Sequence, residues 1–199
     1  MNKPKNIVLI AAAAILSGAA SLPANAVDFY VGGAVGASNF GNTGTAQEGV
    51  SAKRRDVGYK VLLGARFMPE LAIEGGYTDL GKAKFNLAVP GGAVVGNLNG
   101  SGIFVDAVGT LPINSDWSAF AKVGMLSGKI KVSVGMAGQS DSLSDTVTGA
   151  RFGFGATYSV TKAVSIRTEW ERSRGDATLG GQSVKGNVDL LSVGLNYSF

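Results

Sequence analysis

Alternation of apolar and polar residues with a period of two runs through most of this chain, and it constrains the fold more than any other feature. Successive side chains of a β-strand point to opposite faces, so this period predicts strands with two different faces. Eight segments carry the pattern, at 27–38, 57–67, 70–80, 101–112, 116–134, 148–160, 163–173 and 187–199. None of them keeps the 3.6-residue period of an amphipathic helix. The chain is therefore predicted to be all-β.

The two faces of the predicted strands differ in kind. One is apolar or aromatic at nearly every position and has no charged residue. The other mixes glycine, serine, threonine and asparagine with nine charged side chains, which are Lys60, Arg66, Glu74, Asp106, Lys122, Arg151, Arg167, Glu169 and Glu171. A soluble barrel turns its apolar face to the core, whereas an outer-membrane barrel turns it to lipid. Alternation alone does not separate these two classes.

The aromatic residues and the predicted links favour the membrane barrel. Eleven of the 16 aromatic residues lie on the apolar face, mostly near strand ends, as in the two girdles of membrane barrels. One predicted rim holds Phe29, Phe67, Trp117, Tyr158, Tyr197 and Phe199, and the other holds Tyr59, Tyr77, Phe152 and Trp170. Short links at 68–70, 112–116 and 160–162 alternate with long ones near 39–56, 81–100, 135–147 and 174–186. We predict an eight-stranded antiparallel up-and-down transmembrane β-barrel, with a secreted soluble barrel binding an apolar ligand as the alternative.

The first 26 residues have the order of a secretory signal peptide. Lys3 and Lys5 precede an apolar run over 7–16, and Ala24-Asn25-Ala26 supplies small residues at both positions that a cleavage site requires. The apolar run is shorter than a membrane-spanning helix. We expect residues 1–26 to be removed and residues 27–199 to form one transmembrane barrel domain.

Composition excludes several classes of function. The 199 residues include no Cys and no His, which removes disulfides, thiolate catalysis, imidazole triads and the usual zinc ligands. We therefore expect no enzyme activity and no catalytic, cofactor or metal site. The formal net charge of +4 is too small to indicate nucleic-acid binding.

The inward charges admit two interpretations. An eight-stranded barrel is only wide enough for side chains to fill, and buried charges must be paired. This favours a lumenal network of structural ion pairs. The functional alternative is a site for ions, a proton relay, or a narrow channel for small or hydrophobic solutes.

Two segments of the predicted outer links are candidate contact sites. Lys53, Arg54 and Arg55 would lie at the outer end of the barrel, either as contacts for lipopolysaccharide phosphates or as solvated loop charges. The segment 89–96 is an unusually apolar predicted loop, either a flexible surface segment or a partner-binding patch.

Several short motifs resemble the OmpA-like outer-membrane barrels of Gram-negative bacteria. The ending at 189–199 resembles the last strand of that family, and 165–170 resembles its penultimate strand with an Arg-x-Glu-aromatic pattern. Glu74-Gly75-Gly76-Tyr77 is similar to the Glu-x-Gly-Tyr of the third strand, and 109–112 is similar to the end of the fourth. The resemblance covers the whole predicted mature chain.

The resemblance implies a location, a role and partners. It implies a monomeric barrel with a structural, envelope-integrity role in the outer membrane, in contact with outer-membrane lipid and lipopolysaccharide. It implies that Tyr197 and Phe199 belong to a signal read by the barrel-assembly machinery. Glu74, Lys122, Arg167 and Glu169 match positions of the family's salt-bridged lumenal plug, whereas Val108 lies near the place of a lumenal lysine. The peptidoglycan-binding domain of longer members has no counterpart in this sequence, so a cell-wall tether is not expected.

Overall fold

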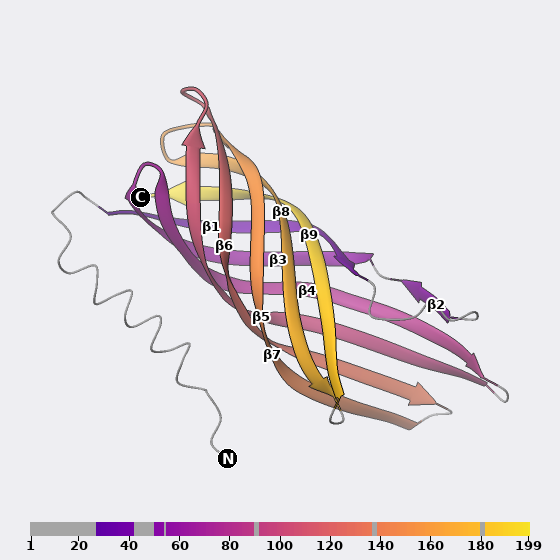
Figure 1. The fold of residues 1–199 in the computed structure, drawn as a ribbon. Helices are drawn as coiled ribbons and strands as arrows, with labels where there is room; N and C mark the ends of the chain where they lie inside the picture. Colours follow the sequence, from indigo (N-terminus) through magenta and orange to yellow (C-terminus); the bar gives the residue numbers. More distant parts are fainter. Residues whose placement is uncertain (1–26, 42–49, 54, 90–91, 137–138, 180–181) are drawn as a thin grey trace, which may run out of the picture.

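The chain is built from antiparallel strands (Figure 1). A computed structural model describes residues 27–41, 50–53, 55–89, 92–136, 139–179 and 182–199, and the predicted signal peptide at 1–26 lies outside them. The strands are β1 (Asp28–Phe40), β2 (Val50–Lys53), β3 (Arg55–Met68), β4 (Leu71–Val89), β5 (Gly92–Pro112), β6 (Trp117–Met136), β7 (Gln139–Ser159), β8 (Val164–Leu179) and β9 (Gln182–Ser198). Within these ranges, no helix has the length and apolar character needed to cross a membrane.

Eight of the strands close into one barrel. Each long strand pairs antiparallel with the next along the chain, from β1 and β3 round to β9, and β9 pairs back with β1. This confirms the predicted eight-stranded up-and-down barrel. The short strand β2, which falls in the predicted link 39–56, pairs with β4 beyond the point where the β3–β4 ladder ends.

An irregularity in β4 separates the ladder with β3 from the one with β2. The β4–β5 register shifts between Asp79 and Lys82. Gly81 has a φ of 75° there, a conformation that costs a residue with a Cβ, and its N–H donates to Asp79 Oδ1 at 2.8 Å. The irregularity lies where β3 gives way to β2 as the neighbour of β4.

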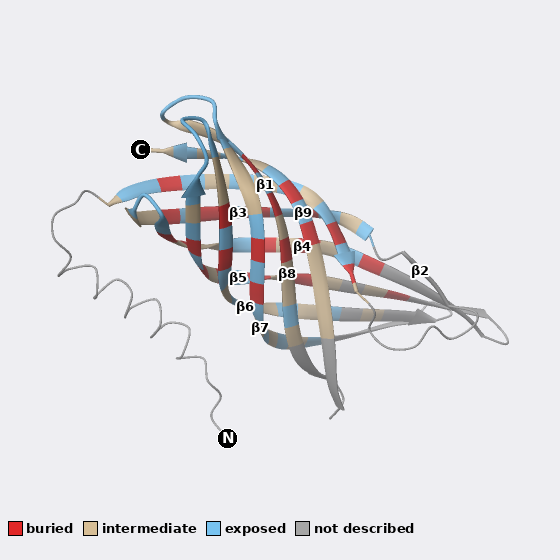
Figure 2. Cartoon of the chain, turned by 45° about the horizontal axis from the view of Figure 1, so that its top comes forward, coloured by how far each residue is buried: buried red, intermediate tan, exposed pale blue. Residues whose placement is uncertain are grey.

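The apolar face of the alternation points outward. Along β3 the side chains of Tyr59, Val61 and Leu63 are exposed, while Lys60 and Leu62 between them are buried. The same banding of exposed and buried residues crosses the other strands (Figure 2). The soluble alternative required the opposite arrangement, with the apolar face lining the core.

Short turns join the strands at one end of the barrel, as predicted. Asn114 Oδ1 accepts hydrogen bonds from the N–H groups of Asp116 and Trp117, at 2.9 and 2.8 Å. Thr161 Oγ1 accepts in the same way from Ala163 and Val164. Side chains of this kind satisfy turn backbone locally, which fixes short links. We call this the short-turn end; the start of β1 and the chain terminus also lie there, since Phe199 N donates to Phe29 O at 3.1 Å.

The prediction of long loops at the opposite end is wrong for three of the four links. Strand pairing continues to Val89↔Gly92, Met136↔Gln139 and Leu179↔Gln182, so 81–100, 135–147 and 174–186 are mostly long hairpins. Strands β5 and β7 have 21 residues each, about twice the length that spans a bilayer. A strand that continues past the length needed to span a bilayer has no lipid-facing side that must stay apolar, while backbone pairing needs no alternation. The apolar segment 89–96 accordingly lies in the β4–β5 hairpin, with residues 90–91 outside the described part.

Aromatic side chains pair on the outer wall near both ends of the membrane span. Trp117 and Tyr158, both from the rim predicted at the short-turn end, have ring centroids 5.0 Å apart. Tyr59 and Tyr77, from the other predicted rim, are 6.5 Å apart. Phe152 and Trp170 of that second rim are 5.9 Å apart.

Candidate functional site

Eight charged side chains from six strands meet inside the barrel, and we call them the lumen charge cluster. They are Lys60 of β3, Glu74 of β4, Asp106 of β5, Lys122 of β6, Arg151 of β7, and Arg167, Glu169 and Glu171 of β8. All eight are buried. Four are cations and four are anions, so their formal charges cancel.

Glu74 and Arg167 form one half of the cluster. The guanidinium of Arg167 places two nitrogens on the Glu74 carboxylate, with Nη2 3.3 Å from Oε2, and Tyr30 Oη donates to Oε1 at 2.7 Å. Arg167 Nε also lies 2.9 Å from Glu169 Oε2. A carboxylate with three donors and no solvent access has its desolvation offset by charge-assisted hydrogen bonds.

Two lysines and the paired carboxylates of β8 form the other half. Lys60 Nζ contacts both Glu169 and Glu171. Lys122 Nζ contacts the same two carboxylates, at 3.0 Å for Glu171, and lies 3.3 Å from Asp106. Each β8 carboxylate therefore faces more than one cation. The cluster is one connected network.

The guanidinium groups of the two arginines each lie against the face of an aromatic ring. The Arg151 guanidinium lies 4.0 Å from the centroid of the Phe104 ring, and that of Arg167 lies 3.9 Å from Phe120. Arg151 also places Nε 3.2 Å from Asp106 and contacts Glu171 through Nη2. Cation–π contacts add stabilisation to buried guanidinium groups that water cannot reach.

Sequence reasoning did not find these inward aromatics. Tyr30, Phe104 and Phe120 belong to a buried apolar group in the lumen that also contains Leu62, Ala72 and Val108. They occupy inward positions of their strands. The alternation that predicts inward charged residues therefore also predicts that these aromatic residues point into the lumen. Val108, near the expected place of a lumenal lysine, is packed in this group.

Glycines on the inner wall create the space for these rings. A Cβ on Gly64 would overlap the ring of Tyr30, and one on Gly155 would overlap Phe120. At Gly153 the missing Cβ leaves room for a cationic side chain instead, since a Cβ there would crowd Lys122 Cε.

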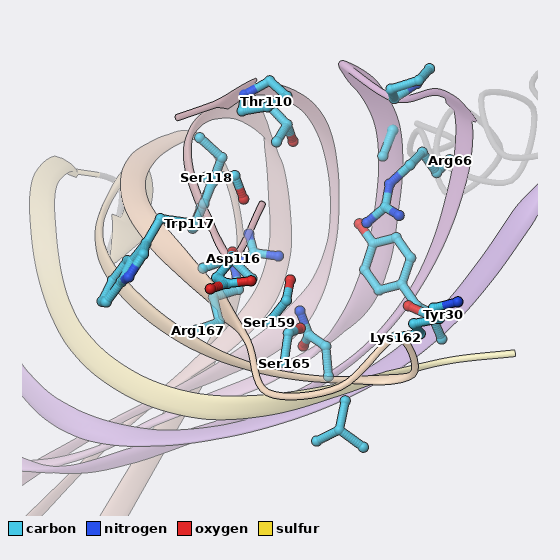
Figure 3. A pocket seen from close by; sticks show the side chains of 18 of the residues that line it. Tyr30, Arg66, Thr110, Asp116, Trp117, Ser118, Ser159, Lys162, Ser165 and Arg167 are labelled. Atoms are coloured by element: carbon cyan, nitrogen blue, oxygen red, sulfur yellow. The ribbon is translucent and has the colours of Figure 1, made fainter. Parts of the chain in front are cut away.

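Arg66 lies outside the lumen charge cluster. Its guanidinium carbon is 5.4 Å from the Tyr30 ring, in a polar cavity of about 250 Å³ at the short-turn end. Asp116, Lys162 and several serine and threonine side chains line the same cavity, and its lining includes Glu74 and Arg167 of the cluster (Figure 3). The lumen is therefore hollow from this end up to the first ion pair.

A further apolar group lies on the other side of the charge cluster. Phe40, Leu80, Ala83 and Leu190 form a second buried group, with Val188 packed against it. A void of only about 10 Å³, lined in part by Lys60, Arg167 and Glu169, lies within the cluster region. That is about the volume that one water-sized probe requires. The charged side chains fill the lumen at the level of the cluster.

The remaining predicted sites lie on the outer wall or in the hairpins. Tyr197 and Phe199 are exposed, and their rings pack edge to face with centroids 5.4 Å apart. Arg55 is exposed at the start of β3, opposite Asn39 of β1. Lys53 ends β2, where only the backbone is described, and Arg54 lies outside the described residues.

The chemistry available to the lumen charge cluster is that of mutual neutralisation. Each carboxylate contacts at least one cation, and in the described part of the chain no group of three or more acidic side chains is placed to hold a metal ion. Breaking such a network by removing one member leaves an uncompensated buried charge. Its geometry suits stabilisation of the barrel and closure of its lumen.

Comparison with known proteins places the chain in a family. Residues 24–199 match the OmpA-like transmembrane domain. Outer membrane protein A of Shigella dysenteriae is 26% identical over 176 residues, and that of Klebsiella aerogenes is 27% identical over 177. Each match covers 86% of this chain and 48% of the relative, so the chain spans about half the length of these curated relatives.

Solved structures share the fold. Ail, the attachment invasion locus protein of Yersinia pestis, superposes with a TM-score of 0.56 at 16% identity, covering 86% of this chain and 99% of Ail. Neisserial surface protein A gives 0.54 at 18% identity, covering 86% and 97%. The outward apolar face, the closed eight-stranded barrel and the family match agree. The chain belongs to the OmpA-like family of outer-membrane β-barrels.

Proposed function

We propose that this protein is a structural component of the outer membrane, with a lumen closed by the charge cluster. The observation that carries the proposal is the network of eight buried charges from six strands, in which every cation contacts a carboxylate. An open aqueous channel needs a continuous path, and here long side chains meet across the lumen. We assign no enzymatic activity, which is consistent with the lack of His and Cys in the sequence.

Electrical recording tests this function. We expect the refolded protein to give no conductance steps in planar lipid bilayers, under conditions in which a porin of known conductance does. A shift in gel mobility on boiling verifies that the inserted protein is folded. Regular steps from the folded protein would refute a closed lumen.

A narrow, gated channel is the second candidate, and the cavity at the short-turn end favours it. That cavity reaches Glu74 and Arg167, so the closed section of the lumen begins at this pair. On this hypothesis, Arg167→Ala opens the path and produces conductance steps, whereas Lys162→Ala, at the mouth of the same cavity, does not. A silent, folded Arg167→Ala barrel would count against a gate at this pair.

The partners follow from the same function. We propose that the barrel acts as a monomer, that its outer wall contacts membrane lipid and lipopolysaccharide, and that Arg55 with its neighbours Lys53 and Arg54 contributes to the latter. We also propose that the barrel-assembly machinery recognises Tyr197 and Phe199. Their exposure on the outer wall beside the chain terminus supports this role.

A further inference from the structure

Charged residues on the outer wall are distributed unequally between the two ends of the barrel. Beyond the apolar span, on the side of the long hairpins, six outward cations stand against two carboxylates, Asp79 and Asp189, among the described side chains. The cations are Arg55, Lys82, Lys129, Lys131, Arg172 and Arg174. At the short-turn end, the exposed charged residues are three carboxylates and one cation, Asp28, Glu70, Asp116 and Lys162, and the last two also line the lumenal cavity.

Strand length places the cations at the boundary of the membrane. A transmembrane strand needs about 9–11 residues. Arg172 and Arg174 are the ninth and eleventh residues of β8, which starts at Val164 at the short-turn end. Lys129 is the thirteenth residue of β6. Because outer-membrane barrels keep short turns in the periplasm, these cations lie at the level of the outer-leaflet headgroups.

The aromatic residues of the outer wall also indicate that these cations lie at the level of the headgroups. The Arg174 guanidinium is 5.5 Å from the Phe152 ring, and that of Arg172 is 5.3 Å from Trp170. Aromatic side chains on the outer wall mark the interface between hydrocarbon and headgroups. The two arginines therefore lie immediately above the apolar layer.

Strands β6, β7 and β8, which carry Lys129, Arg172 and Arg174, pair side by side in the barrel wall. Lys129 is opposite Thr146 of β7, and Arg174 is opposite Ala150, on the same face of the sheet. The exposed hydroxyl-bearing side chains of Thr146 and Thr148 lie between them. Arg172 is held by a two-point ion pair with Asp189, at 2.6 and 2.8 Å, whereas Arg174 is exposed.

We propose that Lys129, Arg174 and the threonines between them form a binding site for the phosphorylated sugar headgroup of lipopolysaccharide. Ammonium and guanidinium groups bind phosphate through charge-assisted hydrogen bonds, and hydroxyls bind sugar and phosphate oxygens. Lipopolysaccharide is present in the outer leaflet next to this site. Its acyl chains would lie along the apolar wall on the membrane side of the cations. The inference rests on the proposed contact with outer-membrane lipid. It names a site on β6–β8 that is separate from residues 53–55.

The two tryptophans allow a direct binding measurement. Trp117 lies at the short-turn end and Trp170 lies beside Arg172. Trp117→Phe therefore leaves one fluorescent reporter next to the proposed site. The probe is purified lipopolysaccharide, added to the refolded W117F barrel in zwitterionic detergent, and Trp170 emission gives an apparent Kd.

We expect the Lys129→Ala/Arg174→Ala pair to raise the apparent Kd about tenfold or more, since each removes a charge-assisted contact. Arg174→Lys keeps the charge and is expected to retain most of the affinity. Lys162→Ala, an exposed cation at the opposite end, is the matched control and should leave the Kd unchanged. A gel shift on boiling verifies that each variant is folded.

Three results would overturn the site: equal binding by the double variant and its parent, equal binding of dephosphorylated lipid A, or equal binding of phosphatidylglycerol. The last would assign the patch to anionic phospholipid. None of them bears on whether the lumen is closed, which the conductance experiment decides separately.

Discussion

Arg167 and Glu74 lie on β8 and β4, two strands that do not pair with each other, and their side chains meet across the lumen. Glu74 has no solvent access, and Tyr30 on β1 donates to the same carboxylate. One carboxylate therefore links three strands of the barrel wall. Backbone hydrogen bonds join only neighbouring strands. The Arg167–Glu74 ion pair therefore holds together opposite parts of the barrel wall that the sheet itself does not connect.

Removal of the Glu74 carboxylate should strongly destabilise the barrel. Glu74→Ala leaves the Arg167 guanidinium buried with one fewer counter-charge, and Tyr30 without its acceptor, which predicts a loss of about 3–5 kcal/mol. Urea unfolding of the protein in lipid vesicles, followed by gel mobility without boiling, measures it. Glu70→Ala, at an exposed turn, is the control, and equal midpoints for both variants would contradict the assignment.

The interaction between Glu74 and Arg167 can be measured as a coupling energy. Glu74→Ala and Arg167→Ala should each be destabilising, while the double variant should cost less than the sum of the two, by about 0.5–3 kcal/mol. The second substitution removes the charge that the first left unpaired. Additive losses in the same unfolding assay would mean that the two groups act independently.

Gly64 should tolerate no side chain, because the Tyr30 ring occupies the space that a Cβ would need. Gly64→Ala is expected to displace Tyr30 from Glu74 and to lower stability by about 1–3 kcal/mol. The matched control is Gly33→Ala on the outer wall, where the nearest atom to an added Cβ would be 3.9 Å away. If the two variants unfold at the same urea concentration, the inner wall is less tightly packed than this geometry requires.

The Phe120 ring, which lies against the Arg167 guanidinium, should stabilise the barrel by more than the burial of its apolar volume. Phe120→Leu keeps a buried hydrophobic side chain but removes the cation–π contact, so a loss of about 1–2 kcal/mol is expected. Phe154→Leu changes an exposed ring on the outer wall and serves as the comparison. Unfolding in vesicles should rank Phe120→Leu as the less stable variant; the reverse order would exclude a specific role for the lumenal ring.

Phe199 should matter for assembly and little for the folded barrel. Its side chain is 77% exposed on the outer wall and its main contact is the ring of Tyr197, so Phe199→Ala is expected to lower the free energy of unfolding by only about 0.5–1.5 kcal/mol. In cells, the same substitution should reduce the amount of folded protein in the outer-membrane fraction. A wild-type level there would argue against recognition of this residue by the assembly machinery.

The sequence by itself determined the barrel, its strand count and which residues of each strand lie on the outward and the inward face. Alternation is a local property, since each residue's parity follows from its neighbours, and Lys60 is buried between the exposed Tyr59 and Val61 as that parity predicts. The same local signal failed beyond the membrane. In the β6–β7 hairpin the backbone stays paired as far as Met136↔Gln139, although the sequence there has the composition of a loop.

Only the tertiary structure decided which inward groups meet. Parity placed both Arg66 and Arg167 inside the barrel, but Arg167 pairs with Glu74 while Arg66 lies in the cavity over Tyr30. Contacts across the lumen depend on barrel closure and on the register of each strand pair, and no short segment encodes either. The position of the rings of Phe104 and Phe120 against the arginines follows from that closure, because the lumen is narrow enough for opposite walls to touch.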